Sequence, residues 1–153
     1  MTIAQRLADL GITLPPVAVP AAAYVPFVHA GKLVFLSGHI AKRDGKAWVG
    51  QLGRDTDTAT GQQAARAVAI DLLGTLAAAC DGDLERVRRV VKLVSLVNSA
   101  PDYTEHHLVT NGASNLIGEV FGAERGAHAR AAYGVAQLPM GACVEIELIA
   151  ELA

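Results

Sequence analysis

The chain has 153 residues, of which 52% are hydrophobic and 18% charged, and its formal net charge at pH 7 is −2. This composition is typical of one folded domain and excludes an intrinsically disordered chain. The acidic balance and an aromatic content of 5% argue against a nucleic-acid partner, which needs clustered basic and stacking side chains. We also expect no membrane partner, because neither a polybasic patch nor a bilayer-spanning apolar run is present.

The compartment is inferred from the cysteines and the first residues. Cys80 and Cys143 are too few for a disulfide framework. The N-terminal stretch contains Arg6 and Asp9 and lacks the continuous apolar core of a secretory signal peptide. We therefore expect a cytoplasmic protein.

The predicted elements begin with a short amphipathic helix over residues 3–10, which ends at Gly11. The next segment, residues 14–26, contains four prolines and should be extended and irregular. We divide the chain accordingly into an N-terminal helix with a proline-rich extension, residues 1–20, and a main domain, residues 21–153.

Short strands are expected after the prolines. A β-hairpin should run from about Val25 to Leu36, with a tight turn at Ala30–Lys32. A small further strand is expected at Lys46–Val49.

Two amphipathic helices and a buried strand are predicted in the middle of the chain. The first helix is capped by Thr56 or Thr58 and ends at Asp81–Asp83. The β-branched stretch Arg89–Val97 is typical of a buried strand. The second helix covers about Tyr103–Phe121. Apolar residues at steps of three and four give each helix one buried face: Ala65, Val68, Leu72, Leu73 and Leu76 in the first, and Leu108, Leu116, Ile117, Val120 and Phe121 in the second.

The C-terminal segment is predicted as a hairpin of two strands, Ala131–Ala136 and Cys143–Leu152, joined at Leu138–Gly141. Apolar and acidic side chains alternate on the second strand, so Glu145 lies on its polar face. About six strands and two long helices in this order indicate a single α+β domain with a mainly antiparallel sheet.

One face of this sheet lacks a cover. Two helices can cover only one face, yet the central strands are apolar on both sides. An exposed apolar face of this size marks an interface. We therefore expect a homo-oligomer, with Glu145 and its neighbours turned toward partner subunits.

Three residues are candidates for chemistry, and no motif for a nucleotide, zinc or a nucleophilic serine accompanies them, so no metal or cofactor is expected. Arg130 at a strand entrance suits bidentate binding of a carboxylate or, equally, a structural salt bridge. Glu145 suits proton transfer if it is desolvated, or is a solvated strand residue. Tyr24 suits a hydrogen bond beside a cleft, or plain packing.

Four segments together resemble the RidA/YjgF family. Arg130–Glu147 (RAAYGVAQLPMGACVEIE) is similar to the family's C-terminal signature of an arginine, a short strand, a Leu-Pro turn and a V-E-[IV]-E strand. Leu33–Ile40 (LVFLSGHI) resembles its L-[VI]-[FY]-x-S-G-Q-[IV] segment, and Val90–Val97 its central strand. Tyr24 stands where the family has a tyrosine. The resemblance covers about residues 20–152.

The resemblance implies a chorismate-mutase-like fold assembled as a homotrimer, with sites in the clefts between subunits. It implies hydrolysis of reactive enamine and imine intermediates, such as 2-aminoacrylate, to a 2-oxo acid and ammonia without a metal or cofactor. Arg130 would bind the substrate carboxylate, and Glu145 would orient or deprotonate the attacking water. Tyr24 would line the cleft. Gly38 and the amide of Ala132 would contribute backbone contacts.

The sequence departs from the family pattern at two of these positions. Ala132 stands where the family has a cysteine, which excludes a thiol nucleophile there, and His39 stands in place of a glutamine. Two other functions stay open. One is a non-catalytic trimer that binds a small carboxylate or acts as a regulatory partner. The other is a ribonuclease, which the acidic charge disfavours. Whether His39 or Asn98 joins the site is also open.

Overall fold

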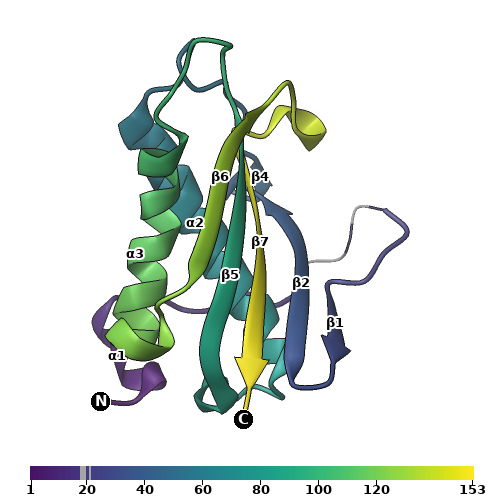
Figure 1. Cartoon of the computed structure of the whole chain (residues 1–153), viewed down its shortest axis with the longest axis vertical. Coiled ribbons are helices and arrows are strands. Elements are labelled where there is room, and N and C mark those ends of the chain that lie inside the picture. The colour runs from purple at the N-terminus through teal and green to yellow at the C-terminus, as the bar shows by residue number, and fades with distance from the viewer. Residues whose placement is uncertain (18–19, 21) are drawn as a thin grey trace.

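A five-stranded sheet with helices on one face makes up most of the computed structural model, which describes residues 1–17, 20 and 22–153 (Figure 1). The sheet order is β1-β2-β7-β5-β6. Its strands are β1 (Phe27–Ala30), β2 (Leu33–Ile40), β5 (Val87–Asn98), β6 (Ala129–Val135) and β7 (Val144–Leu152). The other elements are helices α1 (Ile3–Asp9), α2 (Thr58–Ala79) and α3 (His106–Arg125), and a small ribbon of β3 (Lys42–Arg43) and β4 (Lys46–Ala47).

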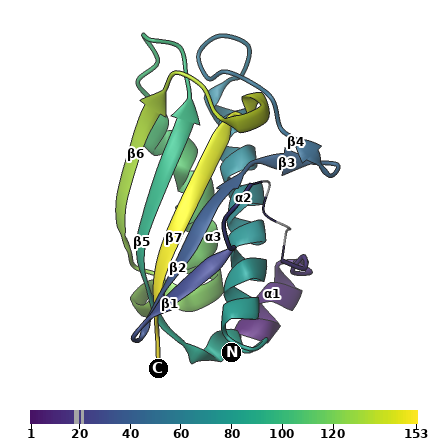
Figure 2. The same ribbon diagram turned by 90° about the vertical axis from the view of Figure 1, so that its right-hand side faces the viewer.

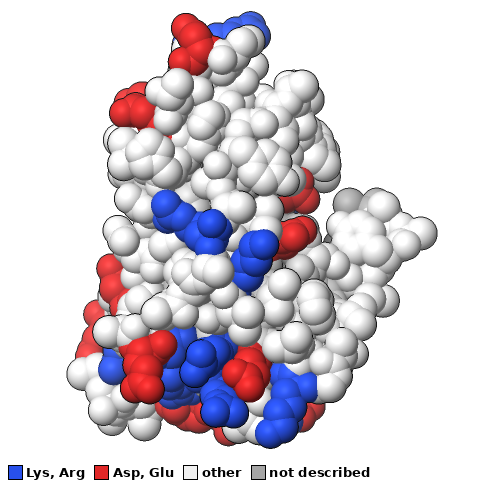
Figure 3. Space-filling view, in the orientation of Figure 1, with Lys and Arg blue, Asp and Glu red and all other residues white. Residues whose placement is uncertain are grey.

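The layered arrangement confirms the predicted α+β fold. Helices α2 and α3 pack on one face of the sheet, and the opposite face has no covering element among the described residues (Figures 1 and 2). That open face presents large apolar side chains, with Val28 53%, Phe35 41% and Tyr133 50% exposed. In Figure 3, charged side chains lie across the middle of this view with uncharged surface around them, and more of them gather at the lower end. That a partner subunit covers it stays a prediction.

The predicted C-terminal hairpin is wrong. Strand β6 pairs in parallel with β5, and β7 lies on the other side of β5, so β5 separates the two expected hairpin arms. The reason is that β5 is apolar on both faces and is stabilised most as a central strand with two neighbours. The parallel β5–β6 pair requires a long connection, which α3 provides.

The strand signals elsewhere are confirmed. Strands β1 and β2 form the expected hairpin, with Ala30 opposite Leu33. On β7 the alternation is complete, because Val144, Ile146 and Leu148 are buried against the helices while Glu145 lies on the open side. The proline-rich segment contains neither helix nor strand between Leu14 and Pro26 in its described part, and residues 18, 19 and 21 lie outside the described residues.

The helices differ from prediction at their ends. Helix α1 has the expected place and buries Ile3 and Leu7 in the same core as the sheet. Helix α2 is capped by Asp57 and not by a threonine: the Asp57 carboxylate accepts a hydrogen bond of 2.8 Å from the Thr60 backbone N–H. The extended backbone of Asp57 allows this contact.

Helix α3 begins later than predicted, at His106. Its backbone breaks at Gly122 (φ 83°), directly after the predicted end at Phe121, and a further helical turn continues to Arg125. Leu108 lies half-exposed, and Val109 and Ala113 take inward positions instead. Among the described residues, no helix is long and apolar enough to cross a membrane.

The cap of α2 gives the first prediction. Asp57→Ala removes the acceptor for the Thr60 amide and should destabilise the fold by about 1 kcal/mol, lowering Tm by about 2–4 °C. Asp57→Asn keeps a capping acceptor and should stay close to the wild type. Thermal unfolding of the two variants checks this. Equal Tm losses in both would contradict the assigned cap.

Candidate active site

A cavity of about 550 Å³ opens beside the free part of the β2 edge. Strand β1 pairs only with residues Leu33–Leu36 of β2, so the edge beyond them faces this cavity. The walls come from the proline-rich segment, from α2 and from the turn before β7. Three of the five candidate site residues line it, namely Tyr24, Gly38 and Glu145. The structure therefore brings these three together.

The contact between Gly38 and Glu145 shapes one end of the cavity. Strand β2 has a bulge between Leu36 and His39, and Gly38 lies within it. A Cβ atom at Gly38 would stand only 2.5 Å from Glu145 Oε1. The glycine is thus needed for close approach of the carboxylate, and not for an unusual backbone angle.

The Glu145 carboxylate is half-buried, and no hydrogen bond or ion pair to another described residue compensates it. Burial raises the pKa of this carboxyl group above its ordinary value, and the negative charge of nearby Glu147 raises it further. A carboxyl group with a raised pKa is suited to accept and return a proton near neutral pH.

Tyr24 lies at the rim of the same cavity, with 49% of its surface exposed. The segment that carries it is tied to β2 by two hydrogen bonds. Ser37 Oγ donates to the Val25 carbonyl at 2.6 Å, and the Ser37 backbone N–H donates to the Pro26 carbonyl at 2.9 Å. These bonds hold the Tyr24 side of the cavity against the strand.

Arg130 lies on the opposite face of the sheet. It pairs in register with Leu93 of β5, whose side chain is buried under the helices, whereas Glu145 pairs with Leu96 on the open face. Because side chains alternate along a strand, the two candidate groups point away from each other within one chain. One protomer does not bring Arg130 to the cavity.

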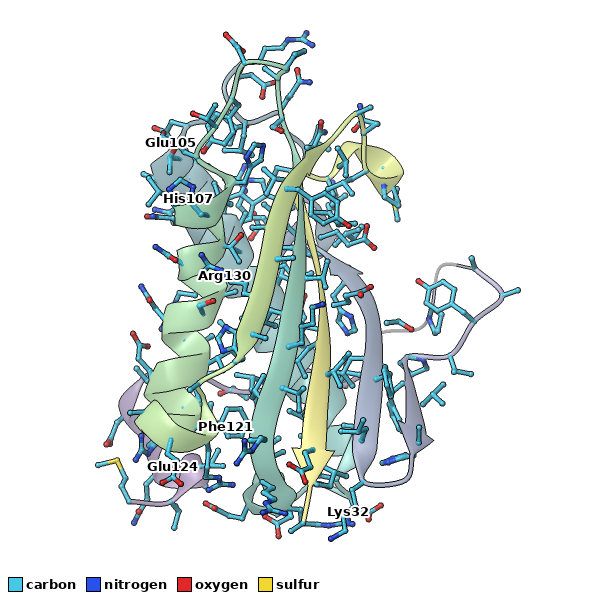
Figure 4. The ribbon with its side chains drawn as sticks, in the orientation of Figure 1. Lys32, Glu105, His107, Phe121, Glu124 and Arg130 are labelled. Atoms are coloured by element: carbon cyan, nitrogen blue, oxygen red, sulfur yellow. The ribbon has the colours of Figure 1, made fainter. Side chains whose placement is uncertain are left out.

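The guanidinium of Arg130 projects toward α3 (Figure 4) and is held by three neutral acceptors. Nη1 donates to Asn111 Oδ1 at 2.8 Å and to Ser114 Oγ at 3.2 Å, and Nη2 donates to the His107 carbonyl at 3.1 Å. No carboxylate among the described residues forms an ion pair with it. The structural salt bridge considered from the sequence is therefore not observed, and the positive charge is positioned but uncompensated.

Ala132 lies two residues further along β6 on the same side as Arg130, opposite the buried Ser95. It does not line the cavity that contains Glu145. Within one chain the candidate residues thus form two groups, one at the β2 edge and one on β6.

His39 is the residue whose position the sequence left open, and it lines the cavity. Its Nδ1 lies 2.6 Å from the Ser37 carbonyl, which can only accept, so Nδ1 carries the proton. Its Nε2 lies 2.7 Å from Thr75 Oγ1 of α2. Burial lowers the pKa of His39, which favours this neutral form.

Asn98, the other residue whose role the sequence left open, lies away from the cavity and donates to Gln137 Oε1 at 2.7 Å. No group of three metal-ligating side chains is present among the described residues.

The close approach at Gly38 gives a testable outcome. Gly38→Ala should leave the fold intact but force the flexible Glu145 side chain away from its position, because the new Cβ would overlap Oε1. Gly118→Ala in α3 is the matched control, since its Cβ would meet no described atom within 4 Å, and it should stabilise by about 0.4–1 kcal/mol. Crystal structures and Tm values check both. An unmoved Glu145 in the Gly38 variant would refute the proposed contact.

The raised pKa of Glu145 predicts how stability depends on pH. A group whose native pKa is raised contributes stability that is present below its unfolded pKa and lost as the pH rises through the native pKa. Glu145→Gln should therefore raise Tm at pH 7 by on the order of 1 °C and lose this advantage near pH 4. Unfolding curves across this pH range test it. A Tm difference that does not vary with pH would count against the assignment.

Known proteins share this sequence and fold along nearly the whole chain. Residues 4–152 match the family described as "YjgF/chorismate_mutase-like, putative endoribonuclease". The chain is 50% identical over 151 residues to "Protein TCP17" of Trypanosoma cruzi, covering 98% of this chain and 94% of that protein.

Two solved structures are similar over the same extent. The protein Atu1372 of Agrobacterium tumefaciens, of unknown function, is 48% identical with a TM-score of 0.90, covering 99% of this chain and 94% of that one. A "putative endoribonuclease" from Shewanella oneidensis is 32% identical with a TM-score of 0.94, covering 99% and 100%. These findings confirm the resemblance inferred from the sequence. The chain belongs to the YjgF/chorismate-mutase-like family.

Proposed function

We propose that the protein is an enamine/imine deaminase that hydrolyses reactive 2-imino and 2-enamino acids to 2-oxo acids and ammonia. The observation that carries the proposal is the half-buried Glu145 carboxylate, whose pKa is raised by burial, at the end of a cavity of about 550 Å³. Membership of the family supports the proposal, because Arg130 and Glu145 lie in the segment that resembles the family's C-terminal signature.

Hydrolysis of an imine needs little activation by the protein, because the imine carbon is already electrophilic. Glu145 accepts a proton from a water molecule as the water oxygen bonds to C2 of the imine. The electrons of the C=N π bond move to nitrogen, which takes up a proton. In the tetrahedral adduct, the hydroxyl proton then passes to nitrogen by way of Glu145. The C–N bond breaks with its electrons leaving on nitrogen, and the carbonyl forms as ammonia departs. One group that accepts and returns a proton, held beside the bound imine, serves both steps.

Substrate binding in this proposal requires a second copy of the chain. Arg130 is a carboxylate-binding group with an uncompensated charge, and it faces away from the cavity of its own chain. Strands β6 and β1 form the two opposite edges of the sheet. A head-to-tail contact between unlike edges generates a closed ring when the rotation fits. In the proposed homotrimer, Arg130 of one subunit reaches the cavity of the next.

Two other functions make different predictions for the same residues. In a non-catalytic carboxylate-binding trimer, Arg130 would still bind a 2-oxo acid, but no ammonia would be released. Endoribonuclease activity is the one that the family's name suggests. A ribonuclease would have to bind a polyanion at a cavity that contains two carboxylates, Asp71 and Glu145, and this disfavours it.

Activity assays of two single variants test the deaminase proposal. Glu145→Gln should lower the rate of ammonia release from 2-aminoacrylate by about 10²–10⁴-fold, because it removes the proton acceptor. Arg130→Ala should act mainly on KM, raising it by about 10-fold or more, because it removes a charge-assisted contact. The wild-type rate should rise with pH through the raised pKa of Glu145, since only the carboxylate form accepts a proton. Unchanged ammonia release in the presence of wild-type protein would contradict the proposal.

A further inference from the structure

The cavity extends well beyond the Glu145 end. Its volume of about 550 Å³ falls within the ~300–1,000 Å³ of sites that hold drug-sized ligands, so an imino acid of three or four carbons fills a small part of it. The remainder runs between the β2 edge and α2 and has a polar inner wall. This second end belongs to no step of the proposed reaction.

A row of neighbouring residues connects the two ends of the cavity. Glu145 lies against Gly38. The residue after Gly38 is His39, and its ring forms a hydrogen bond with Thr75 on α2. Asp71 precedes Thr75 by four residues, so both lie on one side of the helix with their Cβ atoms ~5–6 Å apart. All five residues line the same cavity.

Asp71, like Glu145, has no partner among the described residues. Its carboxylate is half-buried, and it makes no hydrogen bond or ion pair with any described residue. Burial raises the pKa of Asp71, while the positive charge of Lys42, and that of His39 when its ring is protonated, act in the opposite direction. A carboxylate in such surroundings is stabilised by any incoming group that donates hydrogen bonds or carries positive charge.

The remaining lining specifies the rest of the ligand. Apolar surface from prolines and from Ile40 and Met140 lies between and around the polar groups, and it suits the methylene stem of an extended side chain. Lys42 also lines the cavity, but it is exposed, so water and salt screen its charge more than that of the half-buried Asp71. The cavity therefore favours a cation over an anion at this end.

We propose that Asp71 selects ligands whose side chain ends in a guanidinium or ammonium group, so that the preferred substrates are 2-imino acids with a basic side chain. This inference rests on the proposed function in one respect, namely that the imino acid end of the ligand lies at Glu145. The positive end then donates to the Asp71 carboxylate, and the stem lies along the apolar wall.

Binding of stable 2-oxo acids tests the selection without requiring turnover. Calorimetry with the full-length protein compares 5-guanidino-2-oxopentanoate with 2-oxooctanoate, which has a similar length and no charge on its side chain, and with 2-oxoadipate, which ends in a carboxylate. The wild type should bind the guanidino compound at least about 10-fold more tightly than 2-oxooctanoate, as expected for a charge-assisted hydrogen bond. It should bind 2-oxoadipate more weakly than the guanidino compound.

Two variants identify the responsible residue. Asp71→Asn keeps the shape of the side chain and should abolish the preference while leaving the affinity for 2-oxooctanoate unchanged. Lys42→Met is the control and should retain the preference. The inference is overturned if the wild type shows no preference, if the preference survives in Asp71→Asn, or if 2-oxoadipate binds best and Lys42→Met abolishes that binding.

The outcome separates this inference from the proposed function. A preference for the guanidino compound that depends on Asp71, together with no ammonia release from any imine, would contradict the deaminase reaction but support the binding selectivity. Turnover of imines without any preference for a basic side chain would contradict only the proposed selectivity of Asp71.

Discussion

The two-residue repeat of β-strands sets the main constraint on this protein. Arg130 and Glu145 are carried by strands that flank β5, and their register on β5 places them at positions of opposite parity, next to Leu93 and Leu96. Their side chains must therefore leave the sheet on opposite faces, whatever their rotamers. Arg130 is then held against α3 by neutral acceptors, and Glu145 lies against Gly38. A site that uses both groups needs two copies of the chain.

The rest of the architecture is consistent with such an assembly. The sheet has one face covered by helices, one face that carries exposed apolar side chains and has no cover in the described chain, and two unlike edges. Hydrophobic burial favours covering the open face, and the edges differ enough that head-to-tail association is the natural way to pair them. The bulge at Gly38 lies on the part of β2 beyond Phe27, the first residue of β1, where this edge has no paired strand and where an approaching β6 edge would complete the cavity. Oligomerisation, in this account, protects the open face and completes the site with the same contacts.

The sequence predicted those features that depend on local periodicity. The alternation of apolar and acidic residues along β7 correctly placed Glu145 on the open face. The apolar faces of the two predicted helices showed that they could cover only one face of the sheet. It failed where several arrangements satisfy the same local pattern. The β6–β7 hairpin was the simplest connection, but the long apolar β5 is stabilised more by lying between the two. Asp57 and its neighbouring threonines are all good caps, and only the backbone geometry decides among them. The contacts of His39 with Thr75, and the place of Asp71 beside them, depend on how α2 is rotated over β2, for which no sequence pattern exists.

Complementation between two impaired variants, assayed at substrate concentrations well below KM, tests the shared site most directly. Arg130→Ala and Glu145→Gln should each release ammonia slowly under these conditions, but in the proposed trimer, when mixed, one subunit can supply the intact carboxylate and its neighbour the intact guanidinium. Random mixing in equal amounts should restore about a quarter of the wild-type sites, because one in four interfaces then carries both groups. Recovery of ammonia release to about that level after co-assembly is the predicted result. Mixed trimers that stay as inactive as the separate variants would contradict a site built from two chains.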